Sequence, residues 1–150
     1  MRFLRTVSFI VILALFVPLL AGCDRQGGAM RDGYYTAKAA DFGDGGWKDY
    51  VTIYVSDGQI VTAEFNAQTK SGFIRSWDSD YLSNEYAETE LYPSKYFRAY
   101  TTDLVRLQNP ANILAVAGAE RQLEVFQLLA EAAIAHARAG DKTIAVVGLP

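Results

Sequence analysis

The chain has 150 residues, of which 51% are hydrophobic and 21% charged, and this composition indicates one globular domain instead of a disordered or fibrous chain. A net charge of -3 and a pI near 5.1 provide no basic surface for a phosphate backbone, so we expect no nucleic-acid partner. One cysteine and one histidine exclude an internal disulfide, a metal site of paired cysteines and catalysis that needs two histidines. A binding or carrier domain, or an unusual enzyme, remains.

Residues 1–22 have the pattern of an export signal. Arg2 and Arg5 supply positive charge, and an almost unbroken apolar run follows from Val7 to Val17. That apolar segment reaches only the lower limit of the roughly 17–25 residues that span a bilayer, so a transmembrane helix is the weaker alternative. Leu20-Ala21-Gly22-Cys23 then resembles the lipobox of bacterial lipoproteins, in which the cysteine is lipidated and becomes the N-terminus after cleavage.

Cys23 is therefore predicted to carry the lipid that tethers the protein to a membrane. The alternative, a buried cysteine in an uncleaved anchor, fits less well because this cysteine is unique and lies at the end of the signal. Asp24 resembles the signal that retains some lipoproteins in the inner membrane. We expect an exported protein on the inner membrane facing the periplasm, or on the outer face of the cell membrane. Residues 23–32 form the lipid anchor and a short glycine-containing linker.

The folded domain is expected over residues 33–150, and its first half predicts strands. Residues 34–39 suit a strand, and the glycines and aspartates of residues 41–46 indicate a loop. Apolar residues then alternate on both sides of a Ser56-Asp57-Gly58-Gln59 turn, and Asp-Gly between such runs is the strongest short-range signal of a β-hairpin. Residues 68–90 are polar without a sustained period, which predicts a long irregular loop of the kind that often carries function.

The second half predicts two helices and a closing strand. Pro93 suits the first turn of a helix, and apolar residues at helical spacing continue until Pro110. A second helix should run from about Glu120 to Ala139, with Gly140 as its stop, and residues 143–147 suit a short strand. These elements predict an α+β fold in which two main helices pack on one small antiparallel sheet.

Few side chains in the sequence suggest chemistry. His136 is predicted to lie in the last turn of the second helix, where a structural role complements the helix dipole. The acidic stretch between Asp78 and Glu90 lacks the ligand spacing of an EF-hand, so we expect a solvated loop and no metal site. Neither a nucleophilic-serine motif nor a phosphate-binding loop occurs, and we assign no catalytic residue.

The most informative segment is Val116-Ala117-Gly118-Ala119-Glu120, at the predicted start of the second helix. Free N–H groups at a helix start, approachable beside small side chains, favour an anion. The segment resembles a degenerate Val-Ser-Gly-Ala-Thr motif of the FMN-binding domain family, which includes flavin carriers of membrane-bound electron transport and lipoproteins described as major membrane immunogens. The resemblance continues in order along the chain, at Asp32–Thr36, Gly46–Val51, Asp57–Ile60 and Phe126–Asp141.

The departures from this motif concern the flavin itself. In the family, FMN is esterified through its phosphate to the final threonine, but this chain has Glu120 there, Ala117 for the serine and Leu114 for an aspartate. Glutamate has no hydroxyl group, which excludes a covalent flavin at Glu120. Its carboxylate also repels a phosphate by about 1 kcal/mol near a surface. The resemblance therefore implies a degenerate site of Ala117, Gly118, Ala119 and Glu120, in which any FMN is non-covalent.

Two functions of different classes follow from this sequence. The first is a membrane-anchored lipoprotein with an FMN-binding-like domain, acting in electron transfer with a redox partner protein. Trp47, Trp77 and nine tyrosines are available to stack a flavin ring, although most tyrosines are expected to serve the sheet or core. The alternative is a cofactor-free interaction or structural lipoprotein of the cell envelope. A flavin reductase ranks third because no residue is assigned as its catalyst.

Overall fold

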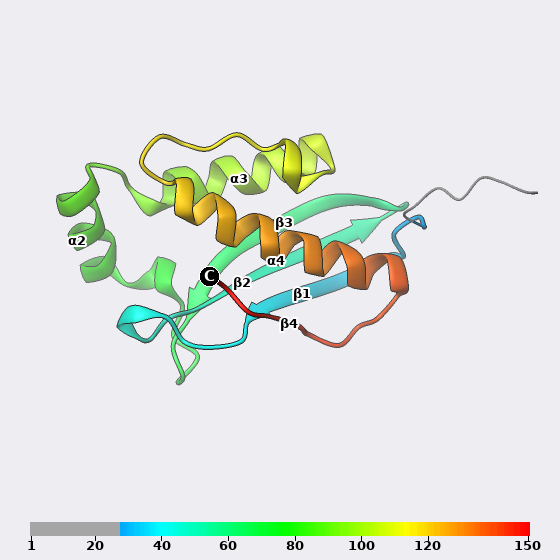
Figure 1. The fold of residues 1–150 in the computed structure, drawn as a ribbon, viewed down its shortest axis with the longest axis horizontal. Helices are drawn as coiled ribbons and strands as arrows, with labels where there is room; N and C mark the ends of the chain where they lie inside the picture. Colours follow the sequence, from blue (N-terminus) through cyan, green and yellow to red (C-terminus); the bar gives the residue numbers. More distant parts are fainter. Residues whose placement is uncertain (1–27) are drawn as a thin grey trace, which may run out of the picture.

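A computed structural model describes residues 28–150 and is built on one four-stranded sheet (Figure 1). The predicted signal and the predicted lipidation site, Cys23, lie outside the described residues. The strands are β1 (Gly33–Ala39), β2 (Lys48–Ser56), β3 (Gln59–Gln68) and β4 (Ala145–Val147), in the order β3-β2-β1-β4. The first three strands pair antiparallel, but β4 pairs parallel to β1. The sheet is thus mixed, where the sequence predicted antiparallel pairing, because the chain reaches β4 through a crossover.

The hairpin of β2 and β3 confirms the Asp-Gly signal. Asp57 and Gly58 both have positive φ, at 53° and 72°, as a two-residue turn that matches the strand twist requires. Ser56 therefore pairs with Gln59, and this register turns Val51, Ile53 and Val55 to the same face, where each is 0% exposed. The turn chemistry thereby decides which residues of β2 enter the core.

Two helices, α3 (Pro93–Leu107) and α4 (Glu120–Ala139), cover one face of this sheet, as predicted (Figure 1). Phe65 on β3 shows that they share the face, since its ring lies 5.2 Å from Phe97 of α3 and 5.2 Å from Phe126 of α4. Pro93 begins α3, and Gly140, at φ 71°, caps the end of α4. The α+β prediction with two main helices is confirmed.

The opposite face of the sheet is exposed to solvent and carries polar and aromatic side-chain pairs between neighbouring strands. Tyr34, which is 67% exposed, stacks on Tyr54 with ring centroids 4.6 Å apart. The hydroxyl oxygens of Thr36 and Thr52 lie 2.9 Å apart across the same two strands. Such cross-strand pairs stabilise an antiparallel sheet without a second layer, so the domain has its core on one side only.

The irregular loop predicted for residues 68–90 is wrong. This segment contains a 3-10 turn, η3 (Arg75–Trp77), and a helix, α2 (Ser79–Thr89). The Asp78 side chain accepts the Tyr81 N–H at 2.9 Å and so starts α2 as an N-cap. No residue of α2 is buried, which explains why its sequence has no apolar period. The acidic residues of this segment therefore lie on and beside a solvated helix. Two further 3-10 turns are η2 (Asp44–Gly46) and η4 (Pro110–Asn112).

Leucine truncations should distinguish the buried face of α4 from the loop before it. Leu129→Ala, at a position 0% exposed, should lower the free energy of unfolding by about 2–5 kcal/mol in urea titrations. Leu114→Ala removes the same atoms from a side chain 82% exposed and should cost less than about 0.5 kcal/mol. Equal losses in the two variants would contradict this placement of the core.

Candidate functional site

The segment singled out in the sequence forms a tight turn directly before α4. Gly118 has φ 84°, a conformation that favours glycine, and the Ala119 N–H donates to the Val116 carbonyl at 2.9 Å. Ala119 is 0% exposed, whereas Ala117 and Glu120 are exposed. The four residues of the predicted site are therefore neighbours in the chain, but their side chains do not face one common hollow.

A buried hydroxyl holds this turn against α3. The Tyr100 hydroxyl donates to the Ala119 carbonyl at 2.8 Å and accepts the Val116 N–H at 3.2 Å. Burial raises the pKa of Tyr100 above its ordinary value, the Val116 N–H opposes this shift, and the Glu120 carboxylate adds to it. Tyr100 therefore remains a neutral group that can donate and accept at once.

Glu120 closes the turn with its own carboxylate. Its Oε1 accepts the Gly118 N–H at 3.1 Å, which takes one of the donors predicted for an anion. The Ala119 N–H is also taken, because it donates to the Val116 carbonyl within the turn. Among the described residues, the N–H groups of residues 120–122 have no partner, as expected for the first turn of a helix. As in every α-helix, these N–H groups point toward the N-terminal end of α4, where they remain available.

A small cavity of about 130 Å³ lies beside the first turn of α4. Its polar lining comes from three parts of the fold: Asp49 on β2, Arg75 on η3, and Arg121 and Gln122 on α4. Phe65, Tyr81, Tyr96 and Val125 complete the wall. Cofactor sites usually have volumes of roughly 300–1,000 Å³, so this cavity is too small to enclose a flavin. Sequence reasoning missed it because residues 68–90 have no pattern that places Arg75.

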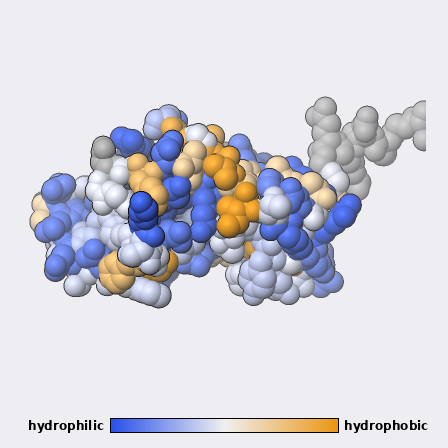
Figure 2. All heavy atoms as spheres, turned by 90° about the horizontal axis from the view of Figure 1, so that it is seen from below, coloured by the Kyte–Doolittle hydropathy of each residue, from blue (hydrophilic) through white to orange (hydrophobic). Residues whose placement is uncertain are grey.

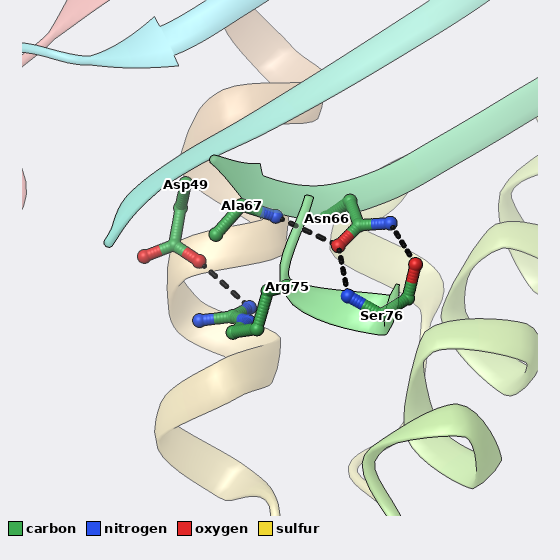
Figure 3. Close-up of polar contacts among 5 residues, drawn as sticks. All are labelled: Asp49, Asn66, Ala67, Arg75 and Ser76. Atoms are coloured by element: carbon green, nitrogen blue, oxygen red, sulfur yellow. Dashed lines mark hydrogen bonds and ion pairs between the residues drawn. The ribbon is translucent and has the colours of Figure 1, made fainter. Parts of the chain in front are cut away.

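Arg75 and Asp49 form a mostly buried ion pair at this cavity (Figure 3). Arg75 Nη2 lies 2.9 Å from Asp49 Oδ1, and the exposed fractions of the two side chains are 10% and 23%. Burial raises the pKa of Asp49, and the Arg75 guanidinium opposes that shift. The Arg75 Nε is buried and has no hydrogen-bond partner among the described residues. The pair therefore leaves part of the guanidinium's hydrogen-bonding capacity unused.

Asn66 fixes the backbone that carries Arg75. Its Nδ2 donates to Ser76 Oγ at 2.8 Å, and its Oδ1 accepts the N–H groups of Ala67 at 2.9 Å and Ser76 at 3.3 Å (Figure 3). Asn66 is only 7% exposed, so these bonds satisfy a polar group that would be costly to bury alone. The end of β3 and the turn η3 are thereby joined, which directs Arg75 back toward β2.

The two tryptophans available for stacking lie near this end of the sheet. The ring centroid of Trp47 lies 6.4 Å from that of Phe73 and 5.9 Å from that of Tyr81. Trp77 is 71% exposed and lies 6.4 Å from Phe73. The aromatic rings thus pack on one another at the surface, and none of these three contacts involves the turn at Gly118.

His136 is held by the segment that follows its helix. Its Nδ1 lies 3.0 Å from the Thr143 carbonyl and 3.9 Å from Asp141 Oδ2. Asp141 in turn accepts the N–H and the hydroxyl of Thr143, and these two bonds lower the pKa of its carboxyl. Within residues 28–150, no group of three or more metal-ligating side chains comes together. The contacts of His136 therefore fit the structural role predicted from the sequence.

The strand β4 forms an apolar edge of the sheet. Ile144, directly before β4, is 52% exposed and Val146 on β4 is 71% exposed, and among the strands of residues 28–150 β4 pairs only with β1. Figure 2 shows hydrophobic atoms gathered among hydrophilic ones near the middle of one face of the molecule. An exposed sheet edge with apolar side chains is a surface that another chain can contact.

One of the comparisons with known proteins indicates the kind of protein. No protein-family model matches the chain. The 15 kDa lipoprotein of Treponema pallidum (strain Nichols) is 32% identical over 124 residues, which cover 83% of this chain and 86% of that relative. Within residues 28–150, no helix has the length and apolar character needed to cross a membrane.

Two solved structures from clostridia share the fold. The crystal structure of a Clostridium perfringens protein has a TM-score of 0.74 and 28% identity, covering 81% of this chain and 99% of that one. The solution structure of a Clostridium thermocellum protein has a TM-score of 0.52 and 32% identity, covering 72% and 92%. Because the Treponema relative is 32% identical over most of both chains, this protein belongs to the family of the 15 kDa lipoprotein.

Proposed function

We propose that this protein is a lipoprotein, tethered to a bacterial membrane through Cys23, whose domain binds another component of the cell envelope without catalysing a reaction. Membership of a lipoprotein family supports the tether, together with the lipobox-like Leu20-Ala21-Gly22-Cys23. Several acyl chains on one cysteine give a stable anchor. The domain begins at Gly33, ten residues after Cys23, and so would stay close to the membrane surface.

The bond between Glu120 and Gly118 is the observation that favours binding without a flavin. The Glu120 Oε1 lies 3.1 Å from the Gly118 nitrogen, so the carboxylate takes an N–H that a phosphate bound at this turn would use. An incoming phosphate would have to displace this carboxylate or lie beside it, and like charges repel. The exposed edge at Ile144 and Val146 offers a surface for a protein partner.

Non-covalent FMN, in an electron-transfer setting with a redox partner, is the second candidate. The order of the motifs along the chain and the unpaired N–H groups of residues 120–122 favour it. It requires Glu120 to turn away from Gly118, and it requires a flavin ring to rest on the surface, because the adjoining cavity of about 130 Å³ is too small. We therefore rank it below the cofactor-free function.

The tether is tested by Cys23→Ser. The variant should move from the membrane fraction to the soluble exported fraction, or accumulate as precursor, because serine cannot take the thioether-linked lipid. Gly28→Ala in the linker is the control and should remain on the membrane, since no atom lies within 4 Å of a side chain added there. Intact-mass spectrometry that finds an uncleaved, unacylated chain in the native host would contradict the tether.

Calorimetric titration with FMN separates the two functions. The cofactor-free function predicts no saturable binding of FMN by the wild-type protein at concentrations up to about 1 mM, a limit that corresponds to roughly 4 kcal/mol. Saturable binding by the wild type would contradict it and support the flavin carrier. In that case Glu120→Thr with Ala117→Ser should bind more tightly by about 1–2 kcal/mol, from lost repulsion and one added hydrogen bond.

A matched variant identifies the residue responsible. Glu124→Thr makes the same substitution one turn further along α4, at an exposed position. It should leave FMN binding as it is in the wild type, because Glu124 does not contact the Gly118 N–H. If Glu124→Thr changed FMN binding as much as Glu120→Thr with Ala117→Ser, the effect would be one of net charge, and the argument from the closed turn would fail.

A further inference from the structure

We propose that the aromatic cluster of Trp47, Phe73 and Trp77 lies in the interfacial layer of the membrane to which the protein is tethered. This inference rests on the proposed tether at Cys23 and adds a second point at which the protein meets the same lipid surface. The occupant of the cluster is the lipid itself, and the edge at β4 remains a separate surface. Such a contact would fix how the domain is oriented on the membrane.

The rings of this cluster are exposed and continuous. Phe73 is 44% exposed and Trp77 is 71% exposed, and their ring centroids lie 6.4 Å apart. Trp47 is half-buried, and its ring centroid lies 6.4 Å from that of Phe73. Phe42, which is 43% exposed, adds a further apolar ring on the loop that leads to Trp47. Apolar side chains gathered in this way at a surface mark a place of contact.

Backbone hydrogen bonds hold the two loops that present these rings. The Thr69 N–H donates to the Phe73 carbonyl at 2.9 Å, and the Thr69 hydroxyl accepts the Phe73 N–H at 3.1 Å. In the neighbouring loop, the Gly43 N–H donates to the Trp47 carbonyl at 2.8 Å. Side chains on loops fixed in this way lose less conformational freedom on binding, so the cluster is formed before it meets a partner.

The chemistry of the cluster fits a lipid interface. Tryptophan is enriched where membrane meets water, because its ring is apolar and its N–H can still reach a polar group. The Lys48 ammonium lies 4.6 Å from the centroid of the Phe42 ring, and Lys70 is exposed on the loop before Phe73. Charges of both signs belong to these loops and their ends, at Asp41, Asp44, Lys48, Lys70 and Asp78. The rings, and not an attraction to anionic lipid, would therefore make the contact.

The length of the tether brings the cluster within reach of the membrane. Gly33, the first residue of β1, lies near the hairpin turn, whereas the loops of the cluster follow the last residues of β1 and β3 at the other end of the sheet (Figure 1). Gly28 follows Cys23 by five positions, which span at most roughly 18 Å. The strand β1 has seven residues and is roughly 23 Å long. Both ends can therefore meet one lipid surface when β1 lies along it.

The same tether explains why a small cluster is enough. An anchored domain meets the lipid surface at a high effective concentration, so a contact too weak to recruit a free protein can still hold the domain in one orientation. Lipid anchoring in general becomes stable when two signals act together. The membrane is thus the surface that this cluster encounters most often, which favours lipid over a protein partner.

The tryptophans are themselves the probes of this contact, since Trp47 and Trp77 are the only two in the chain. The full-length, lipidated protein from its native host is reconstituted into phosphatidylcholine vesicles with plain or brominated acyl chains. Bromine quenches indole emission only at near-contact distance. Emission in the brominated vesicles should be about half of that in the plain vesicles, because Trp77, one of the two emitters, reaches the lipid.

Phe73→Glu is the decisive variant because it keeps both tryptophans and places a carboxylate between them. Quenching by the brominated lipid should fall about threefold or more, since a charged group is costly to move into lipid. Leu114→Glu makes the matched change at an apolar side chain that is 82% exposed in the loop before α4, and it should be quenched as the wild type is. Circular dichroism should show the same fold in all three proteins.

Flotation of the vesicles in a density gradient separates this proposal from the tether. Protein that floats with the vesicles but emits equally in plain and brominated lipid would overturn the membrane contact, leave the tether intact and point to a protein partner or a second copy at the cluster. Equal quenching of the wild type and Phe73→Glu would also overturn the contact, because proximity alone would then account for it. Protein that does not float would overturn the tether and, with it, this proposal.

Discussion

The hydroxyl of Tyr100 fixes the point at which α4 begins. It lies in a fully buried side chain on α3 and bonds both ends of the turn before α4, at Val116 and Ala119. Because α4 crosses β1 and β2 and carries Phe126 into the core, its starting point sets the register of its whole buried face. A shift of one residue would rotate that face by about 100° and expose apolar side chains. The turn and the helix are therefore placed by one interaction.

The same starting point determines two chemically different places. On one side, Glu120 lies within reach of the Gly118 N–H, so the turn resembling a flavin motif is satisfied by the chain itself. On the other side, Arg121 and Gln122 meet Arg75 across a small cavity. The lipoprotein family is established by similarity, whereas the flavin is an expectation that the geometry of Glu120 opposes. The fold and the lipoprotein family therefore describe this protein, and the resemblance to a cofactor site does not by itself fix its function.

Much of the fold could be predicted because its signals are local. The Asp57-Gly58 turn fixed the hairpin, and apolar spacing with Gly140 as a stop gave both ends of α4. The helix α2 was missed since none of its residues is buried, so no period marks it. Arg75 was missed because its burial depends on Asp49, which lies 26 positions earlier and comes close only when Asn66 joins β3 to η3. Candidate sites built on long-range polar contacts of this kind have no signature in one sequence.

The claim that Glu120 closes the turn is tested most directly by the exchange of the Gly118 amide proton with solvent. Glu120→Asp keeps the negative charge but shortens the side chain by one carbon, so the 3.1 Å bond to the Gly118 N–H should be lost. We predict that exchange at Gly118 is about fivefold faster in this variant, which corresponds to a hydrogen bond of about 1 kcal/mol. The unpaired Arg121 amide should exchange at the same rate in both proteins. Equal rates at Gly118 in the wild type and the variant would contradict the account.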